Sequence, residues 1–143
     1  SRYGEFQFVA NNGVFCDCTG HTPPNIPTWV VNGGASYQFT TAGWPWMNAN
    51  WPGEVGMTVR YVGDRFNADV NDTKLLAYTT ADVYAFVDIP RLSWLPTVQN
   101  TRVTFRVRNF TDTKYAVWGD PFYPDQILLG QPRTYEVEAH FRF

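Results

Sequence analysis

The sequence has no long apolar run and no excess of charge of either sign. No stretch approaches the roughly 18 consecutive apolar residues of a membrane-spanning helix, so a helical inner-membrane protein is excluded. Lys and Arg number 11, Asp and Glu 13, and the formal net charge is -2. Because the signs are interspersed, the chain has no basic patch, and we expect no nucleic-acid partner.

Catalytic motifs are also missing. The sequence has no Gly-x-Ser-x-Gly, no His-Glu-x-x-His and no phosphate-binding loop, and only His21 and His140 are available as imidazole bases. Asp82 and Asp88 lie six positions apart on a predicted strand, which separates them by about 20 Å at roughly 3.3 Å per residue. That distance is too long for joint acid-base work. We therefore expect no enzyme and no cofactor.

Cysteine is scarce, with only Cys16 and Cys18 in a predicted loop. We find neither a further cysteine nor a histidine near them in the pattern of a zinc site, so no metal is expected. A bridge between two cysteines that close together needs a sharp turn of the chain. The state of the pair is therefore left open.

Aromatic residues, by contrast, are abundant. They make up 17% of the chain, with 6 Trp, 8 Tyr and 11 Phe, although the mean hydropathy is only -0.31. Outer-membrane barrels combine both properties, because half of each strand faces water and a thin outer belt faces lipid.

The stretch 131–143 shows this pattern most clearly. From Tyr135 onward apolar and polar residues alternate, with Tyr135, Val137, Ala139, Phe141 and Phe143 on one face and mostly ionisable residues on the other. Such a period of two predicts a strand. Its length and terminal aromatic are typical of a strand that crosses a bilayer, although a surface strand of a soluble sandwich is the alternative.

Similar signals recur along the chain and predict an all-β, antiparallel up-and-down meander of about six strands, at 2–9, 29–39, 54–62, 75–89, 101–108 and 131–143. The connections 10–27, 63–74 and 116–130 are polar or rich in glycine, whereas 40–52 and 90–100 carry tryptophan and proline. The meander thus has two distinct ends, as a barrel does when one end faces the outside. Arg102, Arg106 and Arg108 are expected to face a watery lumen, paired with Glu136 and Glu138.

Four tryptophans lie in the connections of the second kind: Trp44, Trp46, Trp51 and Trp94. In a barrel they predict an aromatic girdle at the membrane interface. In a soluble hydrolase or sugar-binding sandwich, the first three would instead form a stacking site for a ligand. We favour the girdle, because aromatics recur at nearly every strand end.

Six pieces of sequence, in order, resemble the C-terminal end of a TonB-dependent outer-membrane receptor of the ferric-siderophore type. They are TPPNIP at 22–27 leading into YQF at 37–39, VRYVGDR at 59–65, AYTTAD at 77–82, RVRNFTDTKY at 106–115, LGQPRTY at 129–135 and the final FRF. The resemblance implies a transmembrane barrel of about 22 strands, of which this chain supplies about the last six. It also implies a plug domain and an energy-coupling box that this chain lacks, so we expect a fragment of a longer receptor.

The resemblance further implies a function and a set of partners. The receptor lies in the bacterial outer membrane, contacts the lipid bilayer, is inserted by the barrel-assembly machinery and is driven by the TonB complex through the missing N-terminal part. Its ligand would be a ferric siderophore or a similar scarce nutrient, either a metal chelate or another small molecule, and it would be a transporter. The alternative is a small autonomous outer-membrane barrel with a binding or adhesion role, which needs at least about eight strands to close.

Two groups of residues are predicted to matter for this function. Ligand contacts are expected from the outer loops, through Phe15, Arg65, Trp118 and Tyr123. In barrels of this kind a terminal aromatic with apolar residues at alternate positions is the assembly signal. Here Tyr135, Val137, Ala139, Phe141 and Phe143 fit that signal.

Overall fold

The computed structural model describes residues 2–9, 15–42, 44–45, 50–91, 97–123 and 125–143. Within these ranges the regular structure consists of β-strands. No helix among the described residues is long and apolar enough to cross a membrane. The chain forms two compact units: a hairpin unit of Ser1–Val31, Arg60–Thr79 and Thr113–Gln131, and a sheet unit of Asn32–Val59, Thr80–Asp112 and Pro132–Phe143.

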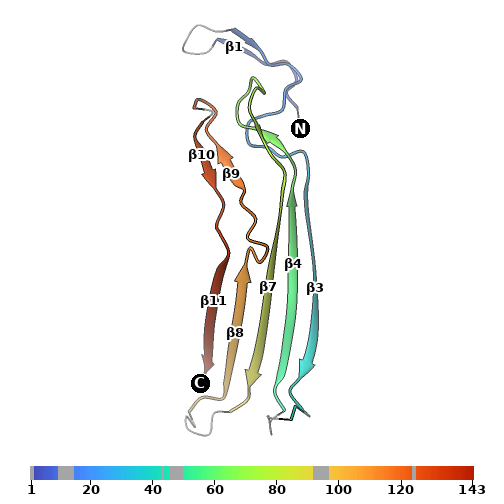
Figure 1. Ribbon diagram of the computed structural model, residues 1–143, viewed down its shortest axis with the longest axis vertical. Helices are drawn as coiled ribbons and strands as arrows, with labels where there is room; N and C mark the ends of the chain where they lie inside the picture. Colours follow the sequence, from blue (N-terminus) through green and yellow to red (C-terminus); the bar gives the residue numbers. More distant parts are fainter. Residues whose placement is uncertain (1, 10–14, 43, 46–49, 92–96, 124) are drawn as a thin grey trace. The chain divides into compact units, whose positions relative to one another are not determined.

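The sheet has five strands in the order β11-β8-β7-β4-β3. Their bounds are β3 Val30–Thr40, β4 Pro52–Val62, β7 Tyr78–Ile89, β8 Asn100–Arg108 and β11 Thr134–Arg142. Successive strands run in opposite directions (Figure 1) and neighbour one another in chain order. The predicted all-β, up-and-down meander is therefore confirmed. Since β3 and β11 are the two ends of this order, the sheet is open and not a closed barrel.

One face of this sheet is apolar across several strands. In β8 and β11, Phe105 is opposite Val137 and Val103 is opposite Ala139, and β7 brings Ala85 opposite Phe105. Val137 is nevertheless 75% exposed and Phe105 45% exposed. An apolar face that the protein itself leaves uncovered is the pattern of a wall that faces lipid.

The other face of the sheet is polar in the same register. Arg102 is opposite both Asp88 on β7 and His140 on β11. Arg106 is likewise opposite Tyr84 and Glu136. The strict alternation in the sequence thus separates a charged face from an apolar one.

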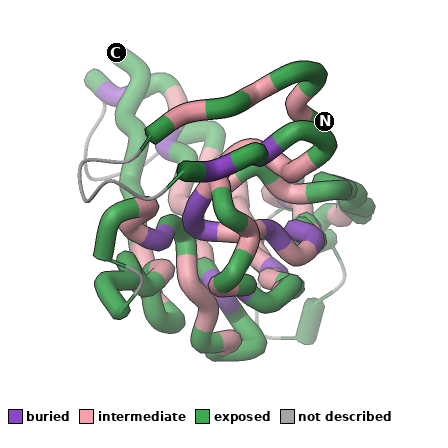
Figure 2. Tube along the Cα trace, turned by 90° about the horizontal axis from the view of Figure 1, so that it is seen from above, coloured by how far each residue is buried: buried purple, intermediate pink, exposed green. Residues whose placement is uncertain are grey.

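The hairpin unit consists of short paired strands. Gln7–Val9 (β1) pairs with Phe15–Asp17 (β2), Arg65–Phe66 (β5) with Lys74–Leu75 (β6), and Ala116–Gly119 (β9) with Ile127–Leu129 (β10). Its buried residues include Cys18, Val62, Ala68 and Leu75, and also the charged Arg65 and the polar Asn67. Most of the chain is exposed or intermediate (Figure 2).

The prediction that residues 2–9 form a strand of the sheet is wrong. Only Gln7–Val9 is a strand, and it pairs with β2 and not with a long neighbour. Phe6 stacks on Tyr3 with ring centroids 4.3 Å apart and contacts Phe8 at 5.4 Å. The alternation of Phe6 and Phe8 therefore reflects a local aromatic cluster, and the meander has five strands where the sequence predicted about six.

Candidate functional site

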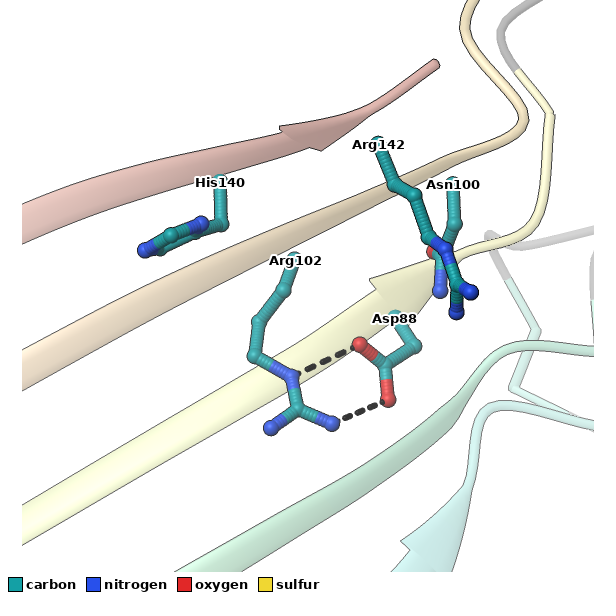
Figure 3. Close-up of a pocket in the computed structure, with 5 residues that line it drawn as sticks. All are labelled: Asp88, Asn100, Arg102, His140 and Arg142. Carbon is teal, nitrogen blue, oxygen red and sulfur yellow. Dashed lines mark hydrogen bonds and ion pairs between the residues drawn. The ribbon is translucent and has the colours of Figure 1, made fainter.

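The polar face of the sheet carries a ladder of paired charges. Arg102 donates through Nε and Nη2 to the two carboxylate oxygens of Asp88, both at 2.8 Å, and its guanidinium lies 4.0 Å from the centre of the Phe86 ring. The pair lies beside a hollow of about 350 Å³ that Asn100, His140 and Arg142 also line; Figure 3 shows these five side chains and the two bonds of the pair. Because the fork geometry satisfies both oxygens, Asp88 is held as a structural partner of the arginine.

Further along the same face Glu136 receives two arginines. Arg108 lies 2.7 Å and Arg106 3.4 Å from its carboxylate. The predicted pairing with Glu136 is confirmed for these two arginines, whereas Arg102 pairs with Asp88 and Glu138 lies 3.4 Å from His140. The reason is register, since Glu138 is opposite Thr104 and Arg102 is opposite Asp88.

The acids on this face have separate structural tasks. Asp82 accepts a hydrogen bond from the backbone N–H of Asn109 at 2.8 Å. Glu54 accepts one from the Tyr84 hydroxyl at 2.7 Å. Asp88 is engaged by Arg102, so each of these three acids has a hydrogen-bond partner of its own.

In the hairpin unit, Arg65 is buried, although the sequence predicted an exposed loop residue. It is only 3% exposed, and its Nη2 donates to the carbonyl oxygens of Ala116 and Val117 at 2.6 and 2.8 Å. Its guanidinium also lies 5.7 Å from the Tyr78 ring centre. The expectation of an exposed, ligand-reaching Arg65 is corrected, because burial and two carbonyl partners make it the support of β9.

Asn25 supports the same strand from another side. Its amide donates to the Gly119 carbonyl at 2.8 Å and its Oδ1 accepts the Gly119 N–H at 2.9 Å. Asn25 has a φ of 58°, a conformation that asparagine tolerates better than most residues. A Cβ on Gly119 would lie 2.8 Å from Cβ of Asn67, so glycine is needed there. The segment 22–27 thus fixes β9 through Asn25.

The other three predicted ligand residues are exposed and lie on two hairpins. Phe15 begins β2 and is 61% exposed. Trp118 is opposite Leu128 in the β9–β10 hairpin, and Tyr123 lies in the connection between these strands. The sequence reasoning missed Phe122, Ile127, Leu128 and Leu129, which are exposed apolar residues of the same hairpin. Residues 127–129 form an unbroken apolar run, ILL. Such a run is unusual in a loop that is otherwise polar, and it was the sequence signal that could have identified these three residues.

Two ionisable groups of the hairpin unit are tied to neighbours. The carboxylate of Asp69 accepts a 2.6 Å hydrogen bond from the Tyr3 hydroxyl, which raises the pKa of Tyr3 to about 12. Lys74 pairs with Asp64 and lowers the pKa of that carboxyl below its ordinary value. Asp64 and Lys74 line a hollow of about 270 Å³ together with Arg2, Thr22 and Thr28.

Cys16 and Cys18 form a disulfide with a Cα–Cα distance of 5.4 Å. The sequence had left this state open. It also found no histidine nearby, and this is corrected: the ligand atoms of Cys16, Cys18 and His21 all lie within 4.8 Å of one another.

The predicted interface and assembly residues are placed as follows. Trp44 is stacked on Phe39 with ring centroids 5.9 Å apart, and Trp51 is partly buried. Trp46 and Trp94 lie outside the described residues. On the edge strand β11 and the residue after it, the exposed residues of one alternate set are Tyr135, Val137, Ala139, Phe141 and Phe143. The girdle and the assembly signal stay predictions.

An open meander of long antiparallel strands, apolar on one face and charged on the other, defines a wall segment of a transmembrane β-barrel. The family described as "TonB dependent receptor-like, beta-barrel" matches residues 2–110. The chain belongs to this family, whose members are receptors and transporters of the outer membrane that work with TonB, not enzymes. The match does not extend to residues 111–143. The comparison with curated proteins finds no match.

Proposed function

We propose that this chain is the C-terminal wall and outer-loop part of a TonB-dependent receptor for a ferric siderophore or a similar metal chelate. In this proposal a plug domain and the earlier strands belong to the rest of the protein. The assembly machinery inserts the barrel, and TonB acts on the part outside this chain. The family membership supports the receptor class.

The exposed β9–β10 hairpin is the observation that carries the ligand part of the proposal. Trp118 is 41%, Phe122 81% and Tyr123 63% exposed, and Arg65 and Asn25 hold the first strand of the hairpin by its backbone. Aromatic side chains on a fixed support bind planar or apolar ligand groups with little loss of rotamer freedom. A chelate of catechol or acyl-chain chemistry fits such a surface.

Uptake by cells tests the proposal. Trp118→Ala combined with Tyr123→Ala in the full-length receptor should weaken uptake of a labelled ferric chelate by at least about tenfold, the effect of losing roughly 1.4 kcal/mol of binding. Phe110→Ala is the matched control, because Phe110 is an aromatic residue that is 52% exposed in the sheet unit.

The result must depend on TonB and not on receptor abundance. Equal amounts of folded receptor in the outer membrane should be verified for all variants, and a strain without TonB should show no uptake. Undiminished uptake by the double variant would move the binding site away from this hairpin.

A further inference from the structure

The proposed receptor function makes no use of the group formed by Cys16, Cys18 and His21. Cys18 is fully buried and Cys16 is 8% exposed. Thiolate and imidazole are the ligands that Zn²⁺ and related borderline ions prefer. The group therefore has the chemistry of a metal site, with its two sulfur atoms joined in a bridge.

A tight turn brings His21 to the cysteines. The N–H of His21 donates to the Cys18 carbonyl at 3.0 Å, and Gly20 between them has a φ of 80°. This is the geometry of a type II turn, which needs glycine at its third position. Asp17 adds to it by accepting the Thr19 N–H at 3.3 Å.

The backbone around the turn is held by bonds other than the bridge. The N–H of Cys18 donates to the Phe6 carbonyl at 2.9 Å, and that of Tyr3 donates to the His21 carbonyl at 2.8 Å. The N–H of Gly20 donates to the Tyr3 carbonyl at 3.1 Å. A bridge between residues only two positions apart restrains the unfolded chain little. Opening it therefore leaves the frame of the three side chains in place.

The histidine ring is oriented as metal-binding histidines are. Its Nδ1 lies 2.8 Å from the backbone carbonyl oxygen of Asp69. Because a carbonyl oxygen can only accept, Nδ1 carries the proton in the neutral ring, and Nε2 is then the nitrogen with the lone pair. A hydrogen bond from the second ring nitrogen to a carbonyl is the usual support of a ligating imidazole.

We propose that reduction of the Cys16–Cys18 bridge opens a site for a single thiophilic divalent ion, such as Zn²⁺ or Cd²⁺. Two electrons and two protons convert the disulfide into two thiols, and binding of the ion then releases those two protons to solvent. Cys16 Sγ, Cys18 Sγ and His21 Nε2 are the three protein ligands, and water is the fourth. Ligands on a tetrahedral zinc lie about 3.5 to 3.8 Å apart, and the two sulfur atoms and one ring nitrogen of His21 lie within 4.8 Å of one another.

Metal binding by the purified full-length receptor in detergent tests the site. A phosphine opens the bridge and is itself oxidised to the phosphine oxide, whose oxygen comes from water; the excess is then removed. The reduced receptor should bind one Cd²⁺, seen as a thiolate-to-metal charge-transfer band, and bound ion should slow alkylation of both thiols. The oxidised receptor should show neither effect.

The two histidines of the chain supply a matched pair of variants. Loss of a residue that only supports a metal ligand weakens metal affinity by roughly tenfold or more. His21→Ala removes a ligand itself and should weaken Cd²⁺ affinity by more than roughly tenfold. His140→Ala should leave binding unchanged, because this residue lies on β11 in the other unit.

Three results of the metal titration would each overturn the site. They are equal Cd²⁺ binding by the oxidised and reduced receptor, unaltered affinity in His21→Ala, and titratable thiols that take up no Cd²⁺. Loss of the hairpin on reduction, seen as rapid hydrogen exchange at 15–21, would also overturn it, because the site requires the frame to survive.

Discussion

At the scale of the residue, Arg65 shows how a cation can serve the fold of a hairpin. Its guanidinium is buried and donates to the carbonyls of Ala116 and Val117. Hydrogen bonds to a charged group contribute about 1.5 to 3 kcal/mol each. The Nη2 of Arg65 has these two partners, whereas its Nη1 is buried without a hydrogen-bond partner among the described residues, which offsets part of that contribution.

We expect Arg65→Ala to destabilise the β9–β10 hairpin by about 2 to 4 kcal/mol, because two carbonyl oxygens lose their donor. Native-state hydrogen exchange of the amides at 116–119 measures this local opening. Arg133→Ala is the control, since Arg133 pairs with Asp112 while 41% exposed and should change stability by less than about 1 kcal/mol. Equal protection in the two variants would contradict the role given to Arg65.

Asp64 gives a second test at this scale, through pH. Lys74 lowers the pKa of this carboxyl in the folded protein below 3.8. A carboxyl with a depressed pKa contributes stability that is present above its unfolded value and is lost as the pH falls through the folded value. The β5–β6 hairpin should therefore loosen below about pH 3.8, by a modest amount because the pair is exposed.

Hydrogen exchange at 65–75 between pH 3 and pH 5 checks this dependence. Asp64→Asn should remove the acid-dependent step. Asp72→Asn, on the same connection, should retain it. A step that persists in Asp64→Asn would assign it to another group.

At the scale of the element, the alternation of the sequence predicted the long strands and their faces well. Val103, Phe105 and Val107 share one face with Val137 and Ala139, and the arginines share the other. A period of two is enough to assign the faces, because a shift of one residue in the strand register would move every side chain to the opposite face. The pairing of Arg106 and Arg108 with Glu136 followed from the same argument.

The short hairpins were not predictable in the same way. β1 and β10 each have three residues, too few for a periodic signal, and they depend on contacts far along the chain. Asn25 fixes Gly119 across 94 positions, and His21 reaches Asp69 across 48. The approach of His21 to the cysteines depends on one glycine with a positive φ, which the spacing of the ligands alone did not reveal.

The two faces of β8 can be compared with adjacent substitutions. Phe105→Arg puts a cation on the apolar face, opposite Val137, and Thr104→Arg puts one on the polar face, opposite Glu138. An arginine that faces lipid at mid-depth costs about 2 to 4 kcal/mol, whereas lumen substitutions are tolerated. We expect a large loss of stability in the first variant and little in the second.

Reversible unfolding of the full-length barrel in urea with lipid vesicles measures the difference. Both variants add the same side chain at neighbouring positions, so strand propensity is matched. Equal losses would mean that the apolar face of β8 does not contact lipid.

At the scale of the whole molecule, the chain combines a uniform wall with varied hairpins. The sheet unit has an apolar face and, on its other side, a charged face. Its strands of 9 to 12 residues suit the span of a bilayer. The hairpin unit buries Arg65 and Asn67 together with smaller apolar groups, and polar side chains hold its backbone. Stability thus depends on strand pairing and surrounding lipid in one unit, and on specific hydrogen bonds in the other.

The last prediction concerns Phe143, proposed as the end of the signal read by the barrel-assembly machinery. The residue is 77% exposed and follows β11, whose edge is available for pairing. Fully burying a phenylalanine contributes about 1.5 to 3 kcal/mol, so one that is mostly exposed has little packing to lose within this chain. An edge strand with an aromatic anchor can instead pair by its main chain with the machinery.

Deleting Phe143 from the full-length receptor should therefore lower the amount of folded, heat-resistant protein in the outer membrane several-fold. The melting temperature of the molecules that do assemble should change little, because their wall keeps its strand pairing. Phe141→Ala, on the same face at 47% exposure, should act on yield in the same direction, while Arg142→Ala on the other face should not. A normal yield with a lowered melting temperature would contradict this prediction. Phe143 would then stabilise the assembled barrel by packing and would have no role in its assembly.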